Sequence, residues 1–342
     1  MSVDGYSDFD RDIWDEELED YVPAEILDAH VHLWSEAHKG ELTGPPTGLR
    51  LELGYAGLAD WCAKLFPGRR IHFLALGTPL PGMDVAAHNR WLADQAAQDP
   101  ESAASMVVTP ASDPDEVAEQ VVRLGFVGLK PYRSFAPDLT NARIADFLPD
   151  RLVEVADHFG LAVTLHLSRK DGAADPVNQQ DLARLTARYP RVQWILAHCA
   201  RGFNAFMLER SLEVLRDLPN LWYDTSAVTE LRSHYLLMQR EDRRRVAFGS
   251  DDVVAGCARG KYITYGRAWV FYPGRTELEH CDPRATLVVY EQLRQERQVA
   301  EMLGLTAAEI EAHFAGNARR LLRQVRADSR RASPAAAGRT PA

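Results

Sequence analysis

Eight short apolar segments recur along this chain, and each is followed by a stretch with the composition of a helix. The segments are continuously apolar, which is typical of strands buried on both faces of a parallel sheet. Eight such strands are the number that closes into a barrel. We therefore predict an α/β fold, a (β/α)8 TIM barrel, with strands over residues 26–34, 70–77, 104–110, 126–132, 161–167, 192–199, 221–226 and 245–252.

An open, doubly wound sheet is the main alternative to a barrel. Such a fold usually carries a glycine-rich phosphate-binding turn directly after its first strand. The first strand of this chain instead ends with residues 30–34, His-Val-His-Leu-Trp, so the barrel is favoured. The intervening helices are predicted over residues 55–66, 83–98, 113–124, 141–159, 176–189, 204–218 and 228–239.

The remaining segments define the domain organisation of the 342 residues. Residues 1–24 are acidic, with roughly helical apolar spacing, and predict a short amphipathic helix that stops near Pro23; a disordered acidic arm is the alternative. Residues 25–322 form the barrel domain, in which residues 253–282 cover its mouth and residues 286–322 are helical. Residues 323–342 are rich in Arg, Ser, Ala and Pro, which predicts a disordered tail.

The overall charge excludes some classes of partner. A formal net charge of −10 argues against nucleic acid and against an acidic membrane surface. The four cysteines lack paired spacing, which fits a reducing compartment, and we find neither a leader segment nor an apolar run long enough to span a membrane. We expect a cytoplasmic, soluble enzyme whose partner is a small-molecule substrate, and a homodimer stays open.

Two histidines lie two positions apart at the end of the first strand. Since side chains alternate along a strand, His30 and His32 point to the same side, and Asp28 shares that parity. Two neighbouring imidazoles can bind one divalent cation. A pair of solvent-facing histidines on an amphipathic strand explains the same spacing equally well, so the rest of the chain must decide.

Further polar side chains stand near the ends of other predicted strands. In a (β/α)8 barrel the carboxyl ends of all strands meet at one opening, where the loops build the active site. We therefore expect one site that gathers His30, His32, Lys130, His166, His198 and Asp251. Three imidazoles and one carboxylate suit Zn²⁺, Mn²⁺ or Fe²⁺ with a position left for water.

A bound cation would give this site its chemistry. It would lower the pKa of a bound water from about 15.7 toward about 7, supplying hydroxide at neutral pH. Asp251 is then both a candidate ligand and a candidate acceptor of the water's proton. His198 remains to polarise the substrate or to donate a proton.

The same residues resemble a known motif set. His30-Val-His32, His166 in Thr-Leu-His, His198 in Ile-Leu-Ala-His and Asp251 in Phe-Gly-Ser-Asp are similar to the amidohydrolase superfamily, in the branch called amidohydrolase family 2. Asn317 in Phe-Ala-Gly-Asn-Ala-Arg-Arg-Leu matches its closing segment. The resemblance implies a (β/α)8 barrel with one or two divalent metals, ligands His30, His32, His166 and Asp251, and a catalytic role for His198.

The resemblance leaves the role of Lys130 open. In binuclear members of the superfamily a carboxylated lysine on the fourth strand bridges two metals, and Gly-Leu-Lys130-Pro lies where that residue would be. Lys130 could equally bind an acidic substrate together with Arg133, Arg169 or Arg201, or extend from the barrel rim without a role in the site. We favour one metal ion, with zinc ahead of manganese and iron.

The branch contains hydrolases, lactonases and non-oxidative decarboxylases. Our hypothesis is a metal-dependent hydrolase that uses metal-activated water on an ester, lactone or amide, with Asp251 and His198 as catalytic residues. A metal-dependent decarboxylase of a small carboxylic acid is the alternative. A catalytically silent barrel used as a binding protein is a third class, which the intact ligand set argues against.

Overall fold

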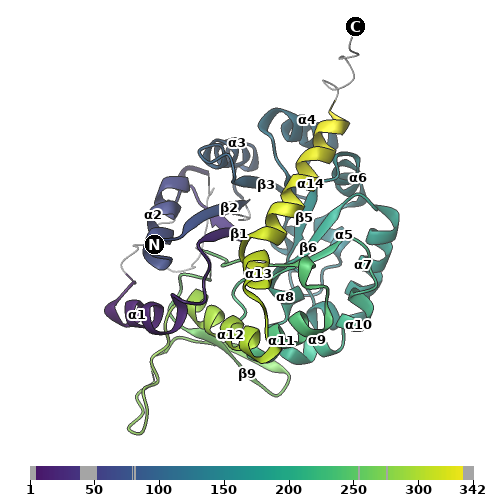
Figure 1. The fold of residues 1–342 in the computed structure, drawn as a ribbon. Coiled ribbons are helices and arrows are strands. Elements are labelled where there is room, and N and C mark those ends of the chain that lie inside the picture. The colour runs from purple at the N-terminus through teal and green to yellow at the C-terminus, as the bar shows by residue number, and fades with distance from the viewer. Residues whose placement is uncertain are drawn as a thin grey trace.

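Eight parallel strands form the core of the molecule and follow one another in chain order (Figure 1). The computed structural model describes residues 5–38, 52–78, 80, 82–252, 255–274 and 276–333. The predicted (β/α)8 TIM barrel is confirmed. Its strands are β1 (Glu25–Leu33), β2 (Arg70–Gly77), β3 (Ala103–Val108), β4 (Gly128–Pro131), β5 (Ala162–Leu165), β6 (Gln193–Leu196), β7 (Leu221–Asp224) and β8 (Val246–Ala247).

The barrel closes where its first strand meets the chain that follows its last strand. The Ala29 amide donates to the Phe248 carbonyl at 2.9 Å, and the Asp251 amide donates to the His30 carbonyl at 2.8 Å. Val31 forms a parallel bridge with the next residue, Asp252. Because β8 itself has only two residues, this seam depends on irregular hydrogen bonds around the predicted site.

A bulge in β1 changes the expected alternation of side chains. Asp28 pairs with Phe73 of β2, but the next registered pair is Val31 with Ala75, so β1 carries one extra residue. The Asp28 carboxylate accepts the amide of His30 at 3.0 Å, so it supports the strand from within. The bulge lies between Asp28 and Val31, so the strict alternation on which the predicted shared side of Asp28 and the two histidines rested is interrupted there.

Helices surround the strands, as Figure 1 shows. They are α2 (Tyr55–Leu65), α3 (Val85–Ala96), α4 (Pro114–Leu124), α5 (Ile144–Phe147), α6 (Asp150–Phe159), α7 (Pro176–Arg188), α8 (Ala197–Arg201), α9 (Ala205–Glu209), α10 (Leu212–Leu215), α11 (Leu231–Arg240), α12 (Val288–Leu303) and α13 (Ala307–Glu311), with short 3-10 turns η2 (Glu36–His38), η3 (Arg133–Phe135), η4 (Gly172–Ala174) and η5 (Arg243–Arg245). The predicted helix 141–159 is divided, because Pro149 caps a new helix and cannot continue the old one.

The acidic N-terminal segment is helical and packs on the barrel domain beside α12 (Figure 1). It consists of α1 (Asp8–Ile13) and a π-helical turn η1 (Trp14–Leu18). Trp14 is buried and meets the Phe66 ring edge-on at 5.9 Å. Buried Asp10 forms an ion pair with Arg259 at 2.6 Å. These contacts favour the amphipathic helix over the disordered arm for the described residues.

The C-terminal end of the chain differs from its prediction. A π-helical turn, η6 (Ala312–Gly316), leads into α14 (Asn317–Ala332), so residues 323–332 are helical and not a disordered tail. The prediction failed because the arginine-rich composition hides an amphipathic helix, whose face carries the buried Leu321, Leu322 and Val325. Residues 334–342 lie outside the described residues.

A two-stranded hairpin covers part of the mouth of the barrel. It consists of β9 (Lys261–Tyr265) and β10 (Ala268–Tyr272) and lies within the segment predicted to do so. The Asn204 amide nitrogen donates to the carbonyls of Gly266 and Ala268, at 3.2 and 2.9 Å, which ties the hairpin to the loop after β6. None of the described helices is both long and apolar enough to cross a membrane.

Candidate metal centre

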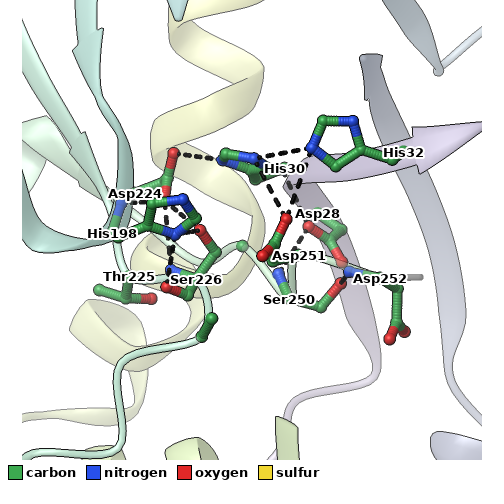
Figure 2. Close-up of polar contacts among 12 residues, drawn as sticks. Asp28, His30, His32, His198, Asp224, Thr225, Ser226, Ser250, Asp251 and Asp252 are labelled. Atoms are coloured by element: carbon green, nitrogen blue, oxygen red, sulfur yellow. Dashed lines mark hydrogen bonds and ion pairs between the residues drawn. The ribbon is translucent and has the colours of Figure 1, made fainter. Parts of the chain in front are cut away.

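Three of the predicted ligands converge at the seam between the first and last strands. Figure 2 shows His30 and His32 side by side with the Asp251 carboxylate facing both. The two Nε2 atoms lie 3.3 Å apart, and Asp251 Oδ1 lies 3.5 Å from each of them. His30 and His32 have no exposed surface and Asp251 is 6% exposed, so these polar groups are held away from bulk water.

Asp224, at the end of β7, supports this cluster through hydrogen bonds. Its Oδ2 accepts a hydrogen bond from His30 Nδ1 at 2.8 Å, and its Oδ1 accepts the backbone amide of His198 at 2.9 Å. A proton fixed on His30 Nδ1 leaves the Nε2 lone pair directed at the cluster. A carboxylate behind a histidine is the usual support for a metal-binding imidazole.

His198 contacts the same carboxylate through its backbone amide, and its ring is next to that of His30. The two ring centroids are 5.0 Å apart, and His198 Nδ1 lies 3.0 Å from the Ser226 carbonyl and 2.9 Å from Ser226 Oγ. Burial lowers the pKa of His198, although Asp224 opposes the shift, so the ring is neutral at pH 7. With its proton on Nδ1, its Nε2 is a base.

The backbone that carries His198 is left-handed. The short segment α8 has φ values of 59°, 51°, 57° and 63° at His198, Cys199, Ala200 and Arg201, and none of these residues is glycine. Each such residue costs about 1–2 kcal/mol relative to the right-handed region. Strain of this kind persists only where surrounding contacts impose it. The contact of Asp224 with the His198 amide is one of them.

His166 lies outside the two closest groups of candidate ligand atoms, although the resemblance implied that it is a ligand. Its ring centroid is 5.0 Å from that of His198, and its Nδ1 lies 3.1 Å from the Leu167 carbonyl, which leaves Nε2 as the free ligand atom. Among the described residues, the groups of three whose ligand atoms all lie within 4.8 Å are His30 with His32 and Asp251, and His30 with His198 and Asp224. Neither group includes His166.

Lys130, on β4, is completely buried near Asp224 and Asp251. Its Nζ has no hydrogen-bond partner among the described residues and lies 5.0 Å from the centroid of the Tyr132 ring. Burial lowers its pKa to about 8, although the carboxylates of Asp224 and Asp251 oppose the shift. A buried ammonium without hydrogen bonds is costly, which is why burial lowers the pKa of Lys130.

The three arginines named from the sequence differ in their partners. Arg169 forms an ion pair with Asp175 at 2.8 Å. Arg133 donates to the Leu139 carbonyl at 3.3 Å, and Arg201 donates to the backbone carbonyl of Arg169. Within the described part of the chain, neither Arg133 nor Arg201 has a carboxylate in salt-bridge distance.

Two other aspartates, Asp28 and Asp252, are buried near the candidate metal centre. Burial raises the pKa of Asp28 to about 7 and that of Asp252 to about 8, and it raises the pKa of Asp251 well above its ordinary value. Asp252 points away from the two histidines (Figure 2). The concentration of carboxylates at one place favours a compensating positive charge.

Sequence reasoning missed Asp224, and a signal for it existed. The predicted strand ran to Ser226, which placed Asp224 inside the strand, whereas β7 ends at Asp224. The rule that polar side chains at strand ends build the site would have found it with the correct boundary. Asn317 is placed elsewhere: its amide donates to the Val246 carbonyl at 2.7 Å and supports β8.

Comparison with known proteins agrees with this architecture. The model of the amidohydrolase family (Amidohydro_2) matches residues 27–324. No curated protein sequence matches the chain significantly. Among solved structures, 5-carboxyvanillate decarboxylase LigW from Sphingomonas paucimobilis is similar, with a TM-score of 0.58 and 15% identity over 88% of this chain and 99% of that one.

Two further structures share the fold. A probable 2-pyrone-4,6-dicarboxylic acid hydrolase from Acinetobacter baumannii has a TM-score of 0.57 and 12% identity, over 87% of this chain and 98% of that one. The 2,6-dihydroxybenzoate decarboxylase from Rhizobium has a TM-score of 0.52 and 14% identity, over 88% and 99%. Since the family model covers most of the sequence, the chain belongs to the amidohydrolase family, whose members are enzymes typically dependent on a metal.

Proposed function

We propose that this protein is a metal-dependent hydrolase of a small organic ester, lactone or amide. His30, His32 and Asp251 would hold one divalent cation, with His166 as the fourth ligand. The observation that carries the proposal is the spacing of the first three ligand atoms, at 3.3, 3.5 and 3.5 Å.

That spacing fits a small tetrahedral ion. Zinc binds imidazole nitrogen at about 2.0–2.1 Å, so two ligands of a tetrahedral site lie about 3.3–3.4 Å apart. Without a cation, three buried groups at this distance would bring two lone pairs and a carboxylate together with too few protons to satisfy them. The same donor set also suits manganese or iron.

The residues around the proposed ion have distinct roles. Bound at this position, the cation would act as a Lewis acid and bring the pKa of a coordinated water near neutrality. Asp224 fixes the tautomer of His30 and, through the His198 amide, the position of His198. His198 Nε2 is free to accept a proton and pass it to the leaving group. Asp251, whose pKa burial raises, is the second proton acceptor.

A decarboxylase is the second candidate. It is supported by the position of Asp251, whose carboxylate lies 3.5 Å from both Nε2 atoms and could deliver a proton to a substrate carbon. Family membership is compatible with both reactions, and the similar structures include decarboxylases as well as a probable hydrolase.

The ligand assignment is tested by metal analysis of purified variants. We expect His30→Ala, His166→Ala and Asp251→Ala each to lower the stoichiometry of bound zinc. His158→Ala, which removes an exposed histidine on α6, is the matched control and should bind zinc as the wild type does. Full stoichiometry in all three ligand variants would refute the assignment.

The reaction is tested with zinc-loaded protein and a panel of lactones, aryl esters, amides and carboxylated aromatics. Uptake of one oxygen from labelled water into the product indicates hydrolysis, whereas release of CO₂ indicates decarboxylation. His198→Ala should retain zinc and lose turnover. An unchanged rate in this variant would remove His198 from the mechanism, and inactivity toward the whole panel would favour a silent binding protein.

We further propose a single metal and a reducing compartment. Lys130 Nζ lies over the Tyr132 ring, which suits an unmodified ammonium and not a carboxylated bridge between two ions. The thiols of Cys62, Cys199 and Cys281 form no disulfide, which supports the cytoplasm as the place of work.

A further inference from the structure

Two arginines at the mouth of the barrel have no acidic partner among the residues that the structure describes. Arg133 follows β4 and Arg201 follows β6, and both are partly buried. In the described structure their guanidinium groups donate only to backbone carbonyls, of Leu139 and Arg169. A buried or half-buried cation normally pairs with a carboxylate or remains costly.

Neighbouring arginines show that partners are normally supplied in this region. Arg143, Arg169 and Arg184, which lie between β4 and β6 in the sequence, form ion pairs with Asp181, Asp175 and Asp150 at 2.6, 2.8 and 2.8 Å. The absence of an acid near Arg133 and Arg201 in the described residues is therefore local.

Backbone contacts hold the two guanidiniums on adjoining loops. The Arg169 amide, in the loop after β5, donates to the Thr140 carbonyl in the loop after β4 at 2.8 Å. Arg201, after β6, donates in turn to the Arg169 carbonyl. The loops after β4, β5 and β6 thus form a continuous row, and His166 at the end of β5 lies in its middle.

The aliphatic part of the Arg201 side chain is held by packing, in addition to the hydrogen bond of its guanidinium. A Cβ atom on Gly172, which has φ +52°, would lie 3.2 Å from Arg201 Cβ and 3.5 Å from its Cδ. Glycine at this position lets the chain approach the arginine closely. Arg201 is therefore positioned before any ligand arrives, which reduces the entropy lost on binding.

The electrostatics agree that these groups share one space. Burial lowers the pKa of Arg201 to about 10, and the charge of Arg133 contributes to that shift. Burial also lowers the pKa of Arg133. Among the residues that the structure describes, no carboxylate lies within salt-bridge distance of either guanidinium.

We propose that Arg133 and Arg201 form a carboxylate-binding subsite, so that the substrate is an organic acid whose carboxylate stays bound while another bond reacts at the metal centre. This inference rests on the proposed function for the reacting end of the substrate. A guanidinium offers paired, planar donors that match a carboxylate, and an anion between two of them would compensate both charges. Arg169 is excluded from the subsite because Asp175 already holds its charge.

The experiment compares binding of simple aromatic acids to zinc-loaded protein by calorimetry. Benzoate has one carboxylate, whereas isophthalate and terephthalate carry a second one at different separations. We expect at least one dicarboxylate to bind the wild type about tenfold or more tightly than benzoate, as charge-assisted hydrogen bonds allow.

Variants assign that preference to the two arginines. Arg133→Met and Arg201→Met should each reduce the preference to about threefold or less. Arg210→Met is the matched control: Arg210 is exposed, stacks over Phe206 at 5.3 Å and should keep the full preference. If a methionine variant does not fold, Arg133→Lys or Arg201→Lys takes its place, and the preference should then fall in part, because lysine keeps the charge and loses the paired donors.

The outcomes separate this subsite from the proposed metal centre. Equal affinity of zinc-loaded wild type for all three acids, or a preference that survives both arginine substitutions, would overturn the subsite. If the wild type binds no zinc, the metal proposal fails. The affinity of the metal-free wild type and of the two arginine variants for benzoate then tests the subsite by itself. A loss of about tenfold in both arginine variants would sustain the subsite, and unchanged binding would refute it.

Discussion

At the scale of single residues, the candidate metal centre depends on Asp224, a carboxylate outside the proposed set of ligands. Asp224 accepts hydrogen bonds from His30 Nδ1, the His198 amide and Ser226 Oγ, the last at 2.5 Å. It therefore sets the orientation of one proposed ligand and of the proposed base together. Such supporting carboxylates commonly contribute 10- to 100-fold to metal affinity.

We predict that Asp224→Asn lowers zinc affinity by about 10- to 100-fold without unfolding the protein. The amide keeps the shape of the side chain but removes the negative charge that favours the required tautomer of His30. Competition with a chromophoric chelator measures the affinity, and the thermal transition checks the fold. Asp217→Asn, which alters an exposed carboxylate, is the control. Wild-type affinity in Asp224→Asn would contradict the assignment.

His88 provides a residue-scale prediction away from the site. It is 1% exposed on α3, its Nε2 accepts the Thr78 amide at 3.1 Å, and burial lowers its pKa to about 4. The unfolded chain, with an ordinary pKa of about 6.5, binds the proton first as the pH falls. Stability is therefore complete above pH 6.5 and is lost toward pH 4, by up to about 3 kcal/mol.

The measurement compares wild type with His88→Gln by urea unfolding at several pH values. The difference in unfolding free energy should shrink by up to about 3 kcal/mol between pH 7 and pH 4, since only the wild type loses this contribution. His158→Gln, at an exposed site on α6, should show a constant difference. A constant difference for His88→Gln would show that its pKa is not depressed.

The residue patterns predicted much of this neighbourhood from the sequence, and the misses have physical causes. The two-residue spacing of His30 and His32 placed their rings together, and the strand-end rule placed Asp251 and His198 nearby. Asp224 was missed because a strand boundary was two residues too late. A hydrogen bond between side chains on different strands leaves no periodicity in either strand.

At the scale of elements, α14 shows how composition can mislead. Arginine and alanine favour a helix as readily as a disordered segment, and the deciding feature is the buried stripe that the helix places against α6 and β1. Val325 in that stripe has no exposed surface. The Arg326 side chain donates to the Ser102 carbonyl at 2.7 Å beside it.

We predict that Val325→Ala lowers the free energy of unfolding by about 2 kcal/mol, because it removes buried methyl groups and leaves a small cavity. Urea unfolding measures the effect. Val122→Ala on α4, where the valine is 46% exposed, should cost much less. Equal costs for the two variants would mean that residues beyond 322 do not contribute to the fold.

The left-handed turn at α8 is the element that sequence could not supply. Residues 198–201 contain no glycine or asparagine, the residues that normally mark positive φ. The local sequence prefers a different backbone, and contacts from β7 override that preference. Periodicity predicted a strand over residues 192–199, whereas β6 ends at Leu196, so the apolar pattern gave no warning of the turn.

At the scale of the whole molecule, counting eight apolar segments was enough to predict the barrel. Parallel strands that are buried on both faces have a continuously apolar sequence, which is easy to recognise. The number of strands was therefore predicted correctly although several of their boundaries were not. The closure of the ring was harder to predict from the sequence, because β8 has only two residues. The seam depends instead on backbone hydrogen bonds of Phe248, Asp251 and η6. These contacts link distant parts of the chain.

We predict that removal of the metal lowers the thermal transition by about 5 °C, since an ion that binds only the folded state stabilises it by about 2.7 kcal/mol at a hundred times its dissociation constant. Calorimetry with and without a chelator measures the change. His32→Ala should abolish the difference, whereas His158→Ala should retain it. An equal effect of the chelator on all three proteins would indicate that it acts elsewhere.

The position of the seam also orders events during synthesis. His30 and His32 leave the ribosome early, but Asp251 follows much later, and the π-turn η6 that receives the Phe248 amide at 3.0 Å comes later still. A nascent chain therefore cannot assemble the proposed cation site until translation has passed η6. Loading with metal would then report that the ring of strands has closed.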